Sequence, residues 1–116
     1  MAKFTGIDYY NLDDILSEEE GMVRDTVREW VDDNLMAVIE EAYIGRKFPR
    51  QLIPQMAELG IYGANLPDEY GCAGLNNVAY GLIMQELERG DSGIRSFASV
   101  QGALCMYPIY EFGSEE

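Results

Sequence analysis

The apolar residues that follow position 17 recur at intervals of three and four, which is the spacing of one face of an α-helix. The first part of this stripe consists of Val23, Val27, Trp30 and Val31. Ser17 and Glu20 have the spacing of a capping box, in which each side chain bonds to the backbone N–H of the other residue. The pattern predicts helical structure as far as Gly45. Because positions 32–34 form helices poorly, Asn34 is a candidate break between two helices.

A second apolar face runs from position 52 to position 59, and two residues mark its ends. Pro49 suits the first position of a helix, where its missing N–H costs nothing, and Gly60 suits the position after the last turn. The pattern therefore predicts a helix that opens at Pro49 and stops at Gly60. The glycine-rich stretch 65–74 that follows is too interrupted for regular structure and is expected to be a connecting loop.

Two further helices complete the pattern. Asn76 or Asn77 is placed to cap a helix that Gly90 closes. Asp91-Ser92 is placed to cap a last helix that runs to about Phe112. No stretch alternates apolar and polar residues for long enough to predict a strand. We therefore predict an all-α fold, an up-and-down bundle of about five helices that forms one domain over residues 1–116.

The charge of the chain narrows the range of partners and chemistry. With 21 acidic and 8 basic residues, the chain has a net charge of −13, which repels the phosphate backbone of nucleic acids. It contains no histidine, so no imidazole is available as a metal ligand or as the base of a nucleophilic pair. The acidic residues lack the alternating spacing of a calcium loop, and we expect no metal site.

Cysteine usage and hydropathy indicate the compartment. Cys72 and Cys105 are far apart in the chain and neither lies in a metal-binding pair, which favours free thiols in a reducing compartment. The start of the chain does not have the pattern of a secretory signal or of a transit peptide. The longest apolar run, 103–110, is too short to span a bilayer. We therefore expect a cytoplasmic protein without a membrane span.

The last predicted helix is unusual because apolar side chains occupy nearly all of its faces between Ile94 and Tyr110, as in a helix that is buried all round. Arg95 lies in its first turns. If Ser92 is the N-cap, Arg95 is the third helical residue, where the positive end of the helix dipole disfavours a cation. A guanidinium in apolar surroundings requires an anion, because an unpaired buried charge costs several kcal/mol.

Two sources of that anion remain open. One is an internal ion pair of Arg95 with Glu88 or Asp91. The other adds the carboxylate of a ligand, which Arg95 would hold with two parallel hydrogen bonds while Ser96 and the N–H groups of the helix end assist. In the second case Glu88 would hold Arg95 in place without neutralising the whole site.

The chain contains three segments in this order: RDTVREWVDDNL (24–35), FPRQLIPQMAELGIYGANLPDEYGCAGL (48–75) and AYGLIMQELERGDSGIRSFASVQGAL (79–104). Together they resemble the N-terminal helical domain of the flavin-dependent acyl-CoA dehydrogenases. The resemblance extends over nearly the whole chain from Ser17 onward. Within that family, the run ERGDSGIRSFASVQGALCMYPIYEFGSEE is most similar to the glutaryl-CoA dehydrogenases.

The resemblance implies roles for four residues. In glutaryl-CoA dehydrogenases the residues that match Arg95 and Ser96 hold the distal carboxylate of the substrate, and the residue that matches Glu88 supports that arginine. The residue that matches Val100 helps to line the acyl cavity. These four are therefore the expected substrate-binding and supporting residues, and no catalytic residue is expected within 1–116.

The resemblance also implies what accompanies this domain. Members of the family have a helical N-terminal domain, a middle β domain and a C-terminal helical domain, usually in a homotetramer, with an electron-transfer flavoprotein as the expected partner. A C-terminal glutamate removes the α-proton of the acyl-CoA thioester while hydride leaves for FAD. None of the FAD-binding segments matches residues 1–116. We expect that the chain is cut before the middle domain and retains no FAD by itself.

Three interpretations of the function remain open. The first is the N-terminal domain of a glutaryl-CoA-type dehydrogenase. The second is a dehydrogenase for another acid-bearing or plain short-chain acyl-CoA, and the third is a helical interaction module without catalysis. Continuation of the reading frame past Glu116 into a β domain would favour an enzyme, and a stop codon at that point would favour the module.

Overall fold

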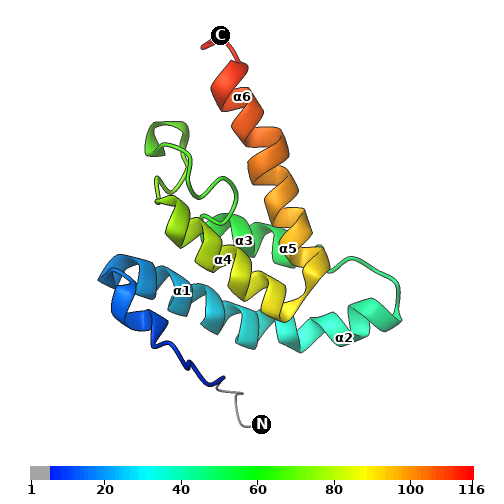
Figure 1. Cartoon of the computed structure of the whole chain (residues 1–116). Helices are drawn as coiled ribbons and strands as arrows, with labels where there is room; N and C mark the ends of the chain where they lie inside the picture. The colour runs from blue at the N-terminus through cyan, green and yellow to red at the C-terminus, as the bar shows by residue number, and fades with distance from the viewer. Residues whose placement is uncertain (1–5) are drawn as a thin grey trace.

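The computed structural model describes residues 6–116 and consists of helices joined by turns and loops (Figure 1). The α-helices are α1 (Glu18–Trp30), α2 (Met36–Ile44), α3 (Leu52–Glu58), α4 (Asn77–Gly90), α5 (Ser92–Ser99) and α6 (Tyr107–Phe112). No strand occurs within the described range, and the predicted all-α class is confirmed. Residues 1–5, part of the segment in which we found no targeting pattern, lie outside that range.

Two pairs of helices are joined end to end by π-helical turns. The segment Val31–Leu35 joins α1 to α2 without a break, so Asn34 does not divide the run. The Asn34 side chain instead donates to the Trp30 carbonyl at 3.3 Å, within the helix. The segment Val100–Met106 joins α5 to α6 in the same way. Figure 1 shows the two resulting rods, one along the base of the view and one that rises from it to the C-terminus.

Side-chain caps begin α1 and α4, as the sequence predicts. Ser17 Oγ accepts from the Glu20 N–H at 3.2 Å and Glu20 Oε2 accepts from the Ser17 N–H at 2.8 Å, which completes the capping box. Asn76 Oδ1 accepts from the Ala79 N–H at 2.8 Å. The Asn76 amide also donates to Glu20 Oε1 at 2.8 Å, so the two caps hold the beginnings of α1 and α4 together.

The third helix begins later than predicted, at Leu52 rather than Pro49. Pro54 explains the difference, because a proline inside a helix lacks its N–H bond and clashes with the preceding turn. A start at Pro49 would place Pro54 in the helix interior, whereas the observed start places it in the first turn, where N–H groups have no helical partner. The predicted stop at Gly60 is confirmed, since its φ of +71° ends the helix in the left-handed conformation.

The cap of α5 is the first residue of the predicted pair Asp91-Ser92. Asp91 has an extended backbone and its Oδ1 accepts from the Ile94 N–H at 2.8 Å, so Asp91 is the N-cap and Ser92 is the first helical residue. The two residues are comparable as caps, but only the one with the extended backbone can occupy the position. Arg95 is consequently the fourth helical residue rather than the third. The hydroxyl of Ser92 is free for another bond.

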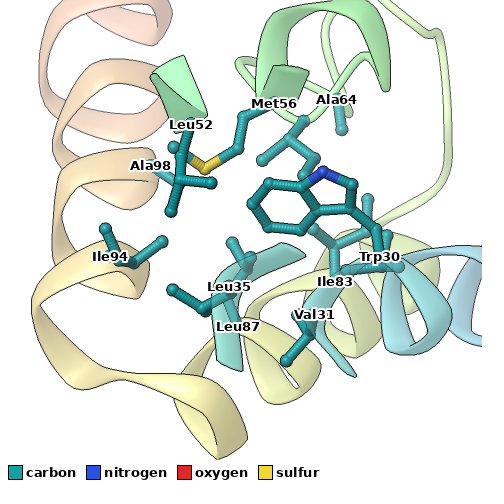
Figure 2. Packing of buried hydrophobic residues seen from close by; sticks show 12 residues of the cluster. Trp30, Val31, Leu35, Leu52, Met56, Ala64, Ile83, Leu87, Ile94 and Ala98 are labelled. Carbon is teal, nitrogen blue, oxygen red and sulfur yellow. The ribbon is translucent and has the colours of Figure 1, made fainter. Parts of the chain in front are cut away.

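One hydrophobic core joins the helices, and Figure 2 shows its side chains converging from several elements. Its buried members are Val27, Trp30, Val31, Leu35, Leu52, Met56, Ile61, Ala64, Ile83, Leu87, Ile94 and Ala98. Trp30 is the largest of them, and its indole Nε1 donates to Gln55 Oε1 at 3.0 Å. The bond satisfies the polar atom of a side chain whose ring is otherwise packed among apolar groups.

The second half of the last rod is exposed, so the expectation of a helix buried all round is wrong for this part. Its exposed large side chains include Leu104, Tyr107, Ile109, Tyr110 and Phe112. The physical reason is that α6 extends past the other α-helices (Figure 1). The loop around Tyr70 lies against Tyr110 but leaves these large side chains exposed. Within residues 6–116, no helix has both the length and the apolar character that a membrane crossing requires.

The last turn of α4 lies against the junction of α1 and α2 at a distance that only glycine permits. A Cβ added to Gly90 would stand 2.5 Å from Leu35 Cδ2 and 2.8 Å from Val31 Cγ1. Both neighbours are completely buried and have little room to move. In contrast, a Cβ added to Gly81, also in α4, would meet nothing within 4 Å.

These two glycines provide a matched test of the packing. We expect Gly90→Ala to lower the free energy of unfolding by about 1–3 kcal/mol, because the added methyl overfills the contact. We expect Gly81→Ala to raise it by about 0.5–1 kcal/mol, because alanine is the better helix former where space is open. Urea denaturation followed by circular dichroism measures both values. Stabilisation by both substitutions would contradict the close approach at Gly90.

Candidate functional site

Helix α4 carries two glutamates, Glu86 and Glu88, whose side chains have opposite environments. The side chain of Glu86 is 1% exposed and that of Glu88 is 47% exposed. Each pairs with partly exposed arginine side chains, so the two clusters differ in the carboxylate, which is enclosed at Glu86 and open to solvent at Glu88. The difference decides which of them is a candidate for binding a ligand.

The buried carboxylate of Glu86 is fully engaged by the protein. Its Oε1 accepts from Arg28 Nη2 at 2.7 Å and its Oε2 accepts from Arg89 Nε at 2.9 Å. Arg89 Nη2 also donates to Asp32 Oδ1 at 2.7 Å, so the network joins α4 to α1 and its π-helical extension. Because both oxygens of Glu86 are occupied, this cluster is a structural link between helices.

The charge of Glu86 is maintained by its partners. Burial by itself would raise the pKa of Glu86, but the hydrogen bonds from Arg28 and Arg89 outweigh it, and the pKa lies below its ordinary value. Glu86 was not among the residues predicted from the sequence. The signal was nevertheless present, because Glu86 lies on the apolar face of its helix with Ala79, Ile83 and Leu87.

The open cluster forms at the corner between α4 and α5, where the predicted site residue Arg95 lies. Arg95 Nε donates to Glu88 Oε2 at 2.7 Å, so Glu88 is the internal partner, whereas Asp91 is used as the cap. Arg95 Nη1 donates to Ser99 Oγ at 3.4 Å, and the Ser99 hydroxyl donates to the Ser96 carbonyl at 3.1 Å. The structure thus brings together the side chains of Glu88 and Arg95 and adds Ser99, whereas the predicted residue Ser96 takes part through its backbone carbonyl.

Arg95 is less buried than the sequence predicts, since 36% of its side chain is exposed. The apolar side chains of the same helix that are buried, Ile94 and Ala98, lie on another face. Burial therefore does not force Arg95 to have a second anion. Among residues 6–116, however, Nη2 of Arg95 donates to no protein acceptor, so one corner of the guanidinium remains available.

Glu88 is held in its ionised form by two donors. The Ser92 hydroxyl donates to Glu88 Oε1 at 2.5 Å, and this bond, followed by that of Arg95, lowers the pKa of Glu88 below its ordinary value. The cluster thus remains an ion pair at neutral pH. Its arginine can accept an additional anion without first losing its partner.

The fourth predicted residue, Val100, lies one turn beyond Ser96 and is the first residue of the π-helical segment that follows α5. Residues four positions apart on a helix share a face, so Ser96 and Val100 are neighbours along one stripe of the rod. The side chain of Val100 is exposed, and that of Ser96 is half-buried. The stripe therefore places an apolar group beside the polar cluster.

Two cavities elsewhere were tested as sites for a dinucleotide cofactor. One, of about 330 Å3, lies between the loop around Tyr70 and the end of the chain, and its lining includes Glu115 but no basic residue. The other, of about 500 Å3, is lined by Arg46 and Lys47, but Asp91 already caps the helix end beside it. Neither provides the free helix end that usually holds a diphosphate.

The described residues also contain no group of three or more cysteine and acidic side chains that could hold a metal ion. Cys72 and Cys105 are both free thiols. The open Glu88–Arg95 cluster remains the candidate functional site.

Comparison with known proteins gives consistent matches. The family described as "Acyl-CoA dehydrogenase, N-terminal domain" matches residues 17–116. Two structures of glutaryl-CoA dehydrogenase from Mycobacterium smegmatis, one in complex with FADH2, are 44% and 48% identical, with TM-scores of 0.87 and 0.85 over 91% and 90% of the chain. The mitochondrial short-chain specific acyl-CoA dehydrogenase of Bos taurus is 33% identical over 87% of the chain. The chain spans only about a quarter of these proteins, 27% of each structure and 24% of the bovine enzyme.

The enclosed cluster yields a prediction about acid stability. Because the pKa of Glu86 is lower in the folded state, its contribution to stability is complete above the ordinary glutamate pKa of about 4.3 and is lost as pH falls through the lower folded value. We expect Glu86→Gln to reduce the free energy of unfolding by about 1–3 kcal/mol at neutral pH. The difference from the wild type should shrink as the pH is lowered.

Denaturation curves at a series of pH values measure this difference directly. Glu29→Gln is the matched control, since Glu29 is exposed on α1, and it should change stability by less than about 0.5 kcal/mol. A difference between wild type and Glu86→Gln that does not vary with pH would show that the charge of Glu86 makes no contribution.

Proposed function

Because the chain belongs to the acyl-CoA dehydrogenase family, we propose that it is the N-terminal helical domain of a flavin-dependent dehydrogenase whose substrate is an acyl-CoA with a distal carboxylate, of the glutaryl-CoA type. In this role the domain contributes part of the acyl pocket. The flavin and the base that removes the α-proton belong to other parts of the enzyme. No step of the reaction is assigned to residues 1–116.

The observation that carries the proposal is the incomplete pairing of Arg95. Its Nε is bonded to Glu88, its Nη1 reaches Ser99 at 3.4 Å, and Nη2 has no protein acceptor within the described residues. A guanidinium is suited to a carboxylate because its N–H groups match the two oxygens in one plane. An acyl chain that lies along the stripe of Ser96 and Val100 would bring its end group to this corner.

Each residue of the cluster has a distinct task in this proposal. Arg95 and Ser96 bind the distal carboxylate, and Val100 lines the methylene chain. Glu88 is a supporting residue, because its bond to Nε fixes the plane of the guanidinium. Because the guanidinium plane is already fixed, the Arg95 side chain loses less conformational entropy when the carboxylate binds.

A plain short-chain acyl-CoA is the second candidate substrate, and the similarity to the bovine short-chain enzyme favours it. In that case the Glu88–Arg95 pair would be a structural link like that of Glu86. The two candidates differ in one measurable quantity, the ratio of the specificity constants for substrates with and without a distal carboxylate. A helical module without catalysis remains a third candidate, which a reading frame that stops at Glu116 would support.

The proposal includes the cofactor, the oligomeric state and the electron acceptor that are usual in the family. The complete enzyme is expected to bind FAD through its other domains, to form a homotetramer and to deliver electrons to an electron-transfer flavoprotein. Because the family binds FAD through segments that do not match residues 1–116, we expect the purified chain to be colourless. Its compartment is proposed to be the cytoplasm.

Arg95→Met in the complete flavoenzyme tests the substrate. The substitution keeps the volume of the side chain roughly similar but removes its hydrogen bonds to a carboxylate. A hydrogen bond to a charged group contributes about 1.5–3 kcal/mol, so kcat/KM for glutaryl-CoA should fall about 10- to 150-fold. The value for butyryl-CoA, which lacks the carboxylate, should fall much less.

The control for this experiment is Arg50→Met, an exposed arginine in the turn before α3. It removes a similar charge outside the cluster and should leave both specificity constants near the wild-type values. Part of the effect at Arg95 comes from Glu88 losing its partner, but that part is common to both substrates. A ratio that Arg95→Met leaves unchanged would eliminate the dicarboxylic substrate.

A further inference from the structure

Ser92 is the residue of the open cluster whose task is not yet explained. It is the first residue of α5 and directly follows the cap position, which Asp91 occupies. The Ser92 hydroxyl instead donates to Glu88 Oε1 at 2.5 Å, one turn back and across the corner between α4 and α5. The short bond joins an exposed hydroxyl to an ionised acceptor.

The bond divides the carboxylate of Glu88 between two donors. Oε1 takes the Ser92 hydroxyl and Oε2 takes Arg95 Nε. A carboxylate that is free to rotate would normally pair with arginine through both oxygens, in two parallel bonds. The second bond would use Nη2, which shares one edge of the guanidinium with Nε. Nη2 is the nitrogen that donates to no protein acceptor among the described residues.

We propose that Ser92 is a positioning residue for substrate specificity: it holds Glu88 in a single bond to Arg95 and thereby keeps Nη2 available for the distal carboxylate of the substrate. This inference rests on the proposed function, since it assumes that Arg95 binds such a carboxylate. Ser92 itself touches neither the substrate nor the reacting atoms. It acts through the orientation of Glu88.

Removal of the Ser92 hydroxyl has a specific consequence. Oε1 of Glu88 loses its donor, and the carboxylate turns to bond Nε and Nη2 of Arg95 together. Glu88 then competes with the distal carboxylate of the substrate for the same nitrogen. Binding of a dicarboxylic substrate weakens, whereas a substrate without the carboxylate does not compete for Nη2.

A purely structural role of Ser92 predicts a different result. If the Ser92 hydroxyl only fastens α5 to α4, its loss lowers the melting temperature and affects both substrates equally. The ratio of specificity constants for glutaryl-CoA and butyryl-CoA is therefore the informative quantity. The separate values of KM and kcat show further whether binding or the chemical step has changed.

The test is Ser92→Ala in the complete flavoenzyme. We expect the ratio of kcat/KM for glutaryl-CoA over butyryl-CoA to fall about 3- to 10-fold, the effect of one hydrogen bond, through a higher KM for glutaryl-CoA. Ser92→Thr keeps a hydroxyl at the same position and should restore most of the ratio. Thr26→Ala removes a hydroxyl from α1, outside the cluster, and should leave the ratio at its wild-type value.

The outcomes separate this inference from the proposed function. If Arg95→Met abolishes the preference for glutaryl-CoA while Ser92→Ala leaves the ratio unchanged, the proposed function stands and the task of Ser92 is refuted. A fall in kcat for both substrates, with no change in the ratio, also refutes it. If the wild-type enzyme has no preference for glutaryl-CoA, the proposed function fails and the inference fails with it.

Discussion

Successive residues of an α-helix are rotated by about 100°, so two residues separated by one position point to nearly opposite sides. This constraint separates the two glutamates of α4. The close approach at Gly90 fixes which side of α4 faces α1, and Glu86 on that side meets Arg28 and Arg89. Glu88 must then face outward, where it bonds Arg95 of the next helix. A buried carboxylate and an exposed one follow from a single packing contact.

The corner after α4 gives the open pair its geometry. Because Asp91 caps α5, the serine that follows it has a hydroxyl to spare, and this hydroxyl reaches back to Glu88. Asp91 and Ser92 are similar as caps, but their order decides which of them is left to contact Glu88. A serine cap followed by an aspartate would place a second carboxylate beside Glu88. That carboxylate would repel Glu88 or compete for Arg95.

The local signals of the sequence predicted much of the fold. The capping box at Ser17, the cap at Asn76 and the stop at Gly60 were all confirmed, because each depends on a few adjacent residues. The predicted start of the third helix was wrong. A start at Pro49 suits the first helical position, but it would place Pro54 in the helix interior. The spacing of α4 did carry a signal for the burial of Glu86, but its distant partner Arg28 could not be predicted from spacing. The exposure of α6 beyond the bundle likewise depends on distant residues.

The central claim is that Nη2 of Arg95 binds the distal carboxylate of the substrate while Nε of Arg95 stays bonded to Glu88. A crystal structure of the complete flavoenzyme with a non-reactive dicarboxylic acyl-CoA analogue tests it most directly. The account predicts the distal carboxylate within hydrogen-bond distance of Arg95 Nη2, with Nε still bonded to Glu88 and the Ser92 hydroxyl still on Oε1. A structure in which Glu88 bonds both Nε and Nη2, or in which the distal carboxylate lies away from Arg95, would contradict it.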